Sequence, residues 1–89
     1  MLSKDILIIN RLGLHARAAA KLAKTAGQFG ASTHVSTEKS SADAKSVMSL
    51  MLLAAIRGTS LKVTTDGKDE LEAMEAIESL INDRFGEEE

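Results

Sequence analysis

Residues 5–26 read DILIINRLGLHARAAAKLAKTA, and this stretch carries the signals of a strand followed by a helix. The short apolar, β-branched run at residues 5–9 predicts a buried strand. From Ala16 to Ala26 the apolar residues recur at spacings of three and four, which predicts a helix with one apolar face. Gly13 lies between the two and can adopt backbone angles that other residues avoid. The chain therefore begins with a predicted β-α unit.

The rest of the chain extends this unit into an α+β pattern. Strands are predicted at 31–37 and 60–65, with a turn and a short strand within 38–43, and a second helix from about Val47. The resulting order is β-α-β-β-α-β-α once a last helix is added. One sheet with its helices on one face is the simplest packing, and residues 1–89 form one predicted domain.

The last helix is predicted to start at Asp69, whose spacing to Glu72 matches a capping box. Arg84 near its end suits the helix dipole, and Gly86 is the predicted stop. The helix is expected to carry its apolar residues on one face: Leu71, Met74, Ile77, Leu80 and Ile81.

Composition excludes several classes of function. The chain has no cysteine, so disulfides and thiolate metal sites are absent, and two histidines without a carboxylate pair at ligand spacing argue against a zinc site. No stretch approaches the roughly 18–20 apolar residues of a membrane helix. The net charge of −2 argues against non-specific nucleic-acid binding. We expect a cytoplasmic protein with no metal, no cofactor, no membrane and no nucleic-acid partner.

The helix start at His15 suggests phosphate chemistry. If His15 is the N-cap, its ring lies beside the free backbone N–H groups of Ala16, Arg17 and Ala18, which form an anion site. The positive helix end disfavours a protonated ring, so a nitrogen lone pair stays available to attack phosphorus. Arg17 adds a charged donor fork for phosphoryl oxygens. The simpler alternative is a histidine that only caps the helix.

Two surfaces could dock another protein. Arg17, Lys21 and Lys24 form a basic stripe, which is either a solvated face or a site for an acidic protein. Residues 46–56 are apolar nearly all round a helix, so Val47, Met48 and Met51 are expected in an exposed patch, unless the later residues leave the helix for the core. Ser46 is expected as the N-cap, and it is also a possible phosphorylation site.

The whole pattern resembles the HPr family of histidine phosphocarriers from bacterial phosphotransferase systems. The resemblance rests on GLHAR at 13–17, AKS at 44–46 before an apolar helix, the Gly-Thr pair at 58–59, and DG before an acidic helix start. It implies an open-faced β-sandwich, with a four-stranded antiparallel sheet and three helices on one face. It also implies phosphorylation of His15 at Nδ1 with Arg17 as the phosphate partner. Ser46 matches a position that a dedicated kinase phosphorylates in some members.

Ala18 departs from the family pattern, because sugar-system members usually have proline there. ARAAAKL at 16–22, MSLMLLAA at 48–55 and the ending LINDRFGEEE are similar to NPr, the nitrogen-related branch. That branch implies an enzyme-I-type phosphoryl donor, a IIA-type acceptor and a monomeric carrier that is not itself an enzyme. The alternatives are a sugar-system HPr and a regulatory HPr-like domain that carries no phosphate. An RNA-binding domain is disfavoured by the acidity and the lack of stacking aromatics.

Overall fold

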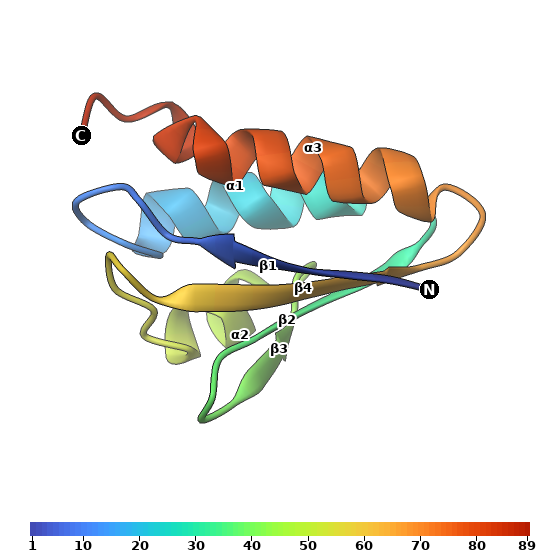
Figure 1. Ribbon diagram of the computed structural model, residues 1–89, viewed down its shortest axis with the longest axis horizontal. Coiled ribbons are helices and arrows are strands. Elements are labelled where there is room, and N and C mark those ends of the chain that lie inside the picture. The colour runs from blue at the N-terminus through green and yellow to red at the C-terminus, as the bar shows by residue number, and fades with distance from the viewer.

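Four strands and three helices follow one another in the predicted order in the computed structural model, which describes residues 1–89 (Figure 1). A short 3₁₀ turn is the only added element. The bounds are β1 Leu2–Leu7, α1 Ala16–Gly27, β2 Ser32–Ser36, β3 Ser41–Asp43, α2 Val47–Leu52, β4 Ser60–Asp66, α3 Glu70–Asn82 and the 3₁₀ turn Arg84–Gly86.

The strands form one antiparallel sheet in the order β1-β4-β2-β3. Its register places Ile6 opposite Leu61 and Val35 opposite Val63, so the apolar residues of neighbouring strands share one face. Because side chains alternate along a strand, His34 falls on the other face, which is open to solvent. The predicted fold class is confirmed.

The core lies between the sheet and its helices. Figure 1 shows α1 and α3 side by side over one face of the sheet, and α2 packs against α1 near the end of β3. The small residues predicted on α1, such as Ala19 and Ala26, are fully buried and allow this close approach. The largest fully buried apolar side chains are Phe85, Ile8, Leu22, Leu50, Leu61, Ile77, Ile81, Val35 and Val63.

The first strand is displaced from its predicted position at residues 5–9. It spans Leu2–Leu7, because the antiparallel register pairs Leu7 with Ser60, where β4 begins. Ile8 follows the strand and is fully buried, whereas Ile9 is partly exposed. The apolar run therefore marks the end of the strand and the start of the loop behind it.

The start of α3 differs from the predicted capping box. Asp69 occupies the N-cap position, but its carboxylate accepts hydrogen bonds from the backbone N–H groups of Gly30 (2.9 Å) and Ala31 (2.8 Å) and none from α3. Asp69 therefore ties α3 to the connection between α1 and β2. Glu72 is exposed and takes no part.

Two further predictions for the last helix are wrong. Leu71 is 55% exposed, because a rotation of 100° per residue puts it about 120° around the helix from Ile77. The helix also ends at Asn82, before Arg84 and Gly86. Arg84 and Phe85 have positive φ angles of 56° and 54°, and this turn directs the last residues back across the molecule.

Candidate functional site

His15 is the N-cap of α1, as predicted. Its backbone is extended, with φ −78° and ψ −179°, and its Nδ1 accepts the backbone N–H of Arg17 at 3.3 Å. A ring nitrogen that accepts a hydrogen bond carries a lone pair and no proton. Nδ1 therefore lies at the positive end of α1 in the form that can act as a nucleophile.

The loop before His15 is fixed by its contact with the segment that follows α2. Leu14 donates its backbone N–H to the carbonyl of Ala55 at 2.9 Å. Gly13 has φ +67°, and a Cβ on it would lie 2.5 Å from the carbonyl oxygen of Ala55 and 2.9 Å from Cα of Ile56. Only glycine fits this close approach without a shift of the backbone.

The C-terminal segment completes the site, which the sequence did not predict. Nε2 of His15 is hydrogen-bonded to Oε2 of Glu87. The side-chain amide of Asn10 donates to Oε1 of the same carboxylate at 3.1 Å and to the carbonyl of Gly13 at 2.9 Å. These two acceptors orient the amide of Asn10, which is fully buried. No local pattern marks the pairing of His15 with Glu87, because it joins residues 72 positions apart.

The charge state of Glu87 follows from its surroundings. Burial acts to raise the pKa of Glu87, but the hydrogen bonds from His15 and Asn10 outweigh it, and the net effect lowers this pKa. The carboxylate is therefore ionised at neutral pH and can only accept, so Nε2 of His15 carries the proton. The His15 side chain is 27% exposed and remains reachable from solvent.

The predicted basic residues are not all free. The side chains of Arg17 and Lys24 are exposed and form no hydrogen bond or ion pair within the chain. Lys21 instead donates to the carbonyl of Phe85 at 2.6 Å and holds the C-terminal turn against α1. Two residues of the basic stripe, Arg17 and Lys24, are therefore exposed and unpaired, whereas Lys21 is bonded within the chain.

Ser46 is the N-cap of α2, as predicted: its Oγ accepts the backbone N–H of Ser49 at 3.2 Å. The backbone of Ser46 is extended, as an N-cap residue requires.

Both interpretations of residues 46–56 hold in part. Leu50, Leu53 and Ala55 are buried, so part of this segment does enter the core. The other apolar side chains stay at the surface, with Met48 71% exposed and Leu52 77% exposed. Contact between Gly13 and Ile56 brings this surface beside the His15 loop. We call it the apolar patch: Val47, Met48, Met51, Leu52 and Ile56.

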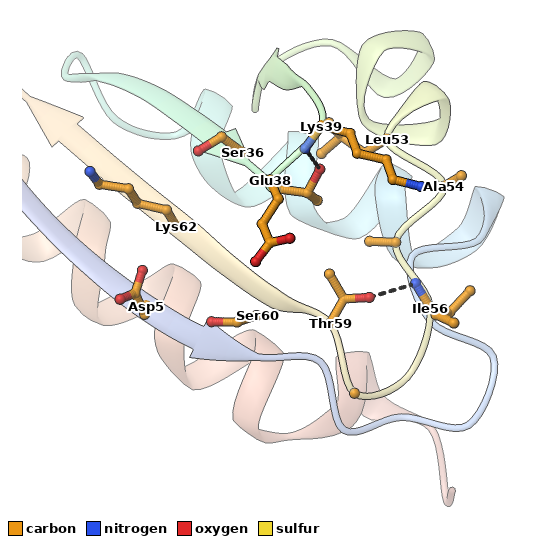
Figure 2. A pocket seen from close by; sticks show the side chains of 13 residues that line it. Asp5, Ser36, Glu38, Lys39, Leu53, Ala54, Ile56, Thr59, Ser60 and Lys62 are labelled. Carbon is orange, nitrogen blue, oxygen red and sulfur yellow. Dashed lines mark hydrogen bonds between the residues drawn. The ribbon is translucent and has the colours of Figure 1, made fainter.

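The site lies on the surface rather than in a cavity. A concavity of about 830 Å³ lies elsewhere, over the open side of the sheet, and it includes neither histidine (Figure 2). No group of three His, Cys, Asp or Glu side chains is placed to hold a metal ion, and no helix is both long and apolar enough to cross a membrane. Figure 2 labels the main lining residues: Asp5, Ser36, Glu38, Lys39, Leu53, Ala54, Ile56, Thr59, Ser60 and Lys62.

Comparison with known proteins adds a match to the family profile described as "PTS HPr component phosphorylation site", over residues 2–83. The chain belongs to the HPr family. It is 52% identical over 87 residues to proteins named phosphocarrier protein HPr from Neisseria meningitidis and Cupriavidus necator, covering 98% of both chains in each case. HPr proteins are phosphocarriers of the phosphotransferase system and not catalysts, so this chain carries a phosphoryl group between other proteins.

A solved structure of the family has the same fold. The crystal structure of HPr-C-His from Thermoanaerobacter tengcongensis superposes with a TM-score of 0.95 at 39% identity, covering all of both chains. The four-stranded open sheet with its three helices is therefore the HPr fold.

Proposed function

We propose that His15 is the residue of this HPr-family chain that carries the phosphoryl group, bound at Nδ1. The observation that supports this role is the geometry of the helix start: the Nδ1 lone pair lies at the N-terminus of α1, next to the backbone N–H of Arg17. The first N–H groups of a helix have no acceptor within it, so those of Ala16, Arg17 and Ala18 can bind the transferred phosphoryl oxygens.

The guanidinium of Arg17 supplies the second part of the phosphate site. It is exposed and unpaired within the chain, so it is free to move onto a group at His15. Its planar donor fork matches two phosphoryl oxygens, and it is charged at any physiological pH. Charge on the carried group is thus stabilised by Arg17 together with the helix dipole.

The donor in this proposal is an enzyme-I-type protein, and the acceptor is a IIA-type protein. The surface that they share is the apolar patch, chiefly Val47, Met48 and Met51, with the exposed Lys24 as its basic component, whereas the predicted contribution of Lys21 is limited by its bond to the carbonyl of Phe85. Methionine side chains adapt to more than one partner shape. Weak and rapidly exchanging complexes suit a shuttle, because tight binding to one partner would delay transfer to the next.

We further propose the nitrogen-related branch for this chain, in which the phosphoryl group serves regulation rather than sugar uptake. Ala18 in place of proline and the methionine-rich MSLMLLAA at 48–55 support this assignment. The second candidate is a sugar-system HPr, since the similar proteins are named phosphocarrier protein HPr, which does not separate the two branches. Ser46 serves first as a helix cap in this proposal, and a phosphate there would add a regulatory charge beside the apolar patch.

The test is phosphoryl transfer from phosphoenolpyruvate, with sugar-type and nitrogen-type enzyme I compared as donors. Intact mass reports one added phosphoryl group, and acid-labile, base-stable chemistry identifies a phosphohistidine. The variant His15→Ala removes the proposed acceptor. His34→Ala is the matched control, because His34 is the other histidine and is exposed on the open face of the sheet.

Labelling that is lost in His15→Ala but kept in His34→Ala would support the proposed site. A faster reaction with nitrogen-type enzyme I would support the proposed branch, and a faster reaction with the sugar-type enzyme would favour the second candidate. Labelling that survives in His15→Ala would overturn the assignment of His15. No labelling by either donor would favour a binding domain that carries no phosphate.

A further inference from the structure

Both ring nitrogens of His15 are engaged, each by a partner of a different kind. Nδ1 accepts the backbone N–H of Arg17, and Nε2 pairs with the carboxylate of Glu87. An ionised carboxylate has only acceptor capacity, and a backbone N–H only donates. The two partners are therefore compatible with one neutral form of the ring, in which Nε2 is protonated and Nδ1 is not.

We propose that Glu87 is a positioning residue for phosphoryl transfer: its carboxylate holds the His15 ring with the proton on Nε2 and the Nδ1 lone pair directed away from it. This inference rests on the proposed role of His15 as the phosphoryl acceptor. Glu87 touches neither phosphorus nor the leaving group, and it acts only through the imidazole ring. The arrangement follows the logic by which a carboxylate orients the histidine of a hydrolytic triad.

The carboxylate is itself held in place from several directions. Asn10, which is fully buried, donates to the Oε1 atom that His15 does not use. Phe85, two residues before Glu87, is also fully buried, and its carbonyl accepts a hydrogen bond from Lys21. The side chain of Glu87 is only 17% exposed as a result. Fixed packing of this kind is what a positioning residue needs.

The polar and charged side chains around Glu87 favour its anionic form. His15 and Asn10 contact the carboxylate directly, and the ammonium group of Lys21 lies near enough to stabilise the negative charge. The last residue, Glu89, is paired separately with Arg11 at 2.8 Å. The tail is thus anchored on both sides of the His15 contact.

Glu87 forms and breaks no covalent bond in the transfer step. The Nδ1 lone pair forms the N–P bond, while the bond from phosphorus to the leaving atom of the phosphorylated donor protein breaks and its electron pair stays on that atom. The proton on Nε2 remains on the ring, which becomes cationic. The carboxylate of Glu87 stabilises that cation, so the contact is stronger in the charged product than in the neutral ring.

The experiment compares the full-length wild type, Glu87→Gln and Glu88→Gln. Glu88 is the matched control, since it is the adjacent glutamate and is exposed without a hydrogen-bond or ion-pair partner. ¹⁵N chemical shifts of the His15 ring report which nitrogen is protonated, and the Nε2 proton resonance reports its hydrogen bond. Rapid-quench kinetics with phosphorylated enzyme I give the transfer rate at saturating donor and the donor concentration for half-maximal rate.

We expect an Nε2-protonated ring with a strongly downfield proton resonance in the wild type and in Glu88→Gln. Glu87→Gln should lose the downfield resonance and slow transfer at saturating donor by about 10–100-fold, the range by which metal-site activity falls when the orienting partner of a metal-binding histidine is removed. A purely structural role would leave the saturated rate unchanged once the variant is shown to be folded at the assay temperature, even though the resonance changes with the loss of the carboxylate.

Two results would overturn the positioning role alone. One is a wild type labelled on His15 with an unchanged saturated rate in Glu87→Gln, and the other is a loss confined to the half-saturating donor concentration, which would indicate docking. A wild type that is never labelled on His15 would instead overturn the proposed function itself. Labelling of the wild type on His15 separates these cases, since it tests the proposed function without any change at Glu87.

Discussion

Gly13 is the residue on which the placement of His15 depends most directly. Its φ of +67° and its close approach to Ala55 leave no room for a side chain. We expect Gly13→Ala to lower the free energy of unfolding by about 2 kcal/mol, because an L-residue is strained at this φ and its Cβ collides with backbone atoms. Urea denaturation followed by circular dichroism measures the change. Transfer to His15 should slow as well, since the loop must shift.

Gly27→Ala is the control for this prediction. Gly27 is the last residue of α1, and a Cβ there would meet nothing within 4 Å. In a helix this change should be neutral or stabilising by up to about 1 kcal/mol. Equal free energies of unfolding for Gly13→Ala and Gly27→Ala would contradict the strain that we assign to a side chain at position 13.

At the residue scale, the sequence predicted the site residues whose signals lie within a few positions of one another, and it missed those whose contacts depend on the distant C-terminal segment. His15 and Arg17 could be predicted because a cap, a glycine and a helical pattern lie within a few positions of each other. Glu87 and Asn10 could not, since their contacts depend on a turn in which Arg84 and Phe85 take positive φ angles. Neither arginine nor phenylalanine is typical of positive φ angles, so the sequence does not indicate this turn.

At the scale of the elements, Asp69 predicts how stability responds to acid. The backbone N–H groups of Gly30 and Ala31 hold the pKa of Asp69 below its ordinary value of 3.8. A carboxyl whose native pKa is lowered stabilises the fold above its unfolded value, and this contribution is lost as pH falls through the native value. We therefore expect Asp69→Asn to be less stable than the wild type at pH 7. The difference should shrink below pH 3.8, as urea titrations at several pH values would show.

Glu72→Gln tests whether the corrected role of Asp69 is right. A capping box would make Glu72 part of the same contact, whereas the structure leaves its side chain exposed and unpaired. We expect Glu72→Gln to match the wild type within about 0.5 kcal/mol across this pH range. A loss equal to that of Asp69→Asn would restore the capping-box interpretation.

The N-cap of α2 gives a second prediction at this scale. Ser46→Ala removes the acceptor of the Ser49 N–H and should cost about 1 kcal/mol in unfolding free energy. Ser46→Asp keeps an acceptor and places negative charge at the helix start, so its stability should remain close to that of the wild type. Thermal unfolding of both variants provides the measurement. Equal losses in Ser46→Ala and Ser46→Asp would contradict the capping role.

Helices and strands were predictable wherever the spacing of apolar residues along the sequence matched the face that is buried in the structure. Alternation at residues 60–65 predicted β4 with Leu61 and Val63 buried, and both side chains are fully buried. The bounds of β1 were not predictable in this way, because they are set by its partner strand rather than by its own apolar run. Leu71 was assigned to the wrong face because one apolar residue in the first turn cannot define the helical stripe alone.

At the scale of the whole molecule, the groups of the proposed site gather at one end. Figure 1 shows α1 beginning at the end where the chain terminates, while α3 begins at the opposite end. The apolar patch is joined to this functional end through the contact of Gly13 with Ile56. Under the proposed function, a partner that reaches His15 would meet the patch at the same time, as a short-lived complex centred on a transferred group requires.

The last prediction separates docking from chemistry. Met48→Lys places a charge in the apolar patch without adding a negative group, and Leu71→Lys makes a similar change on the exposed side of α3. Because both side chains are exposed, each variant should keep its stability within about 0.5 kcal/mol. Met48→Lys should raise the half-saturating concentration of enzyme I about tenfold, the effect of losing an interface contact worth 1–2 kcal/mol. Leu71→Lys should leave it unchanged. Equal changes in this concentration for the two substitutions, measured in rapid-quench assays, would mean that enzyme I does not bind the apolar patch.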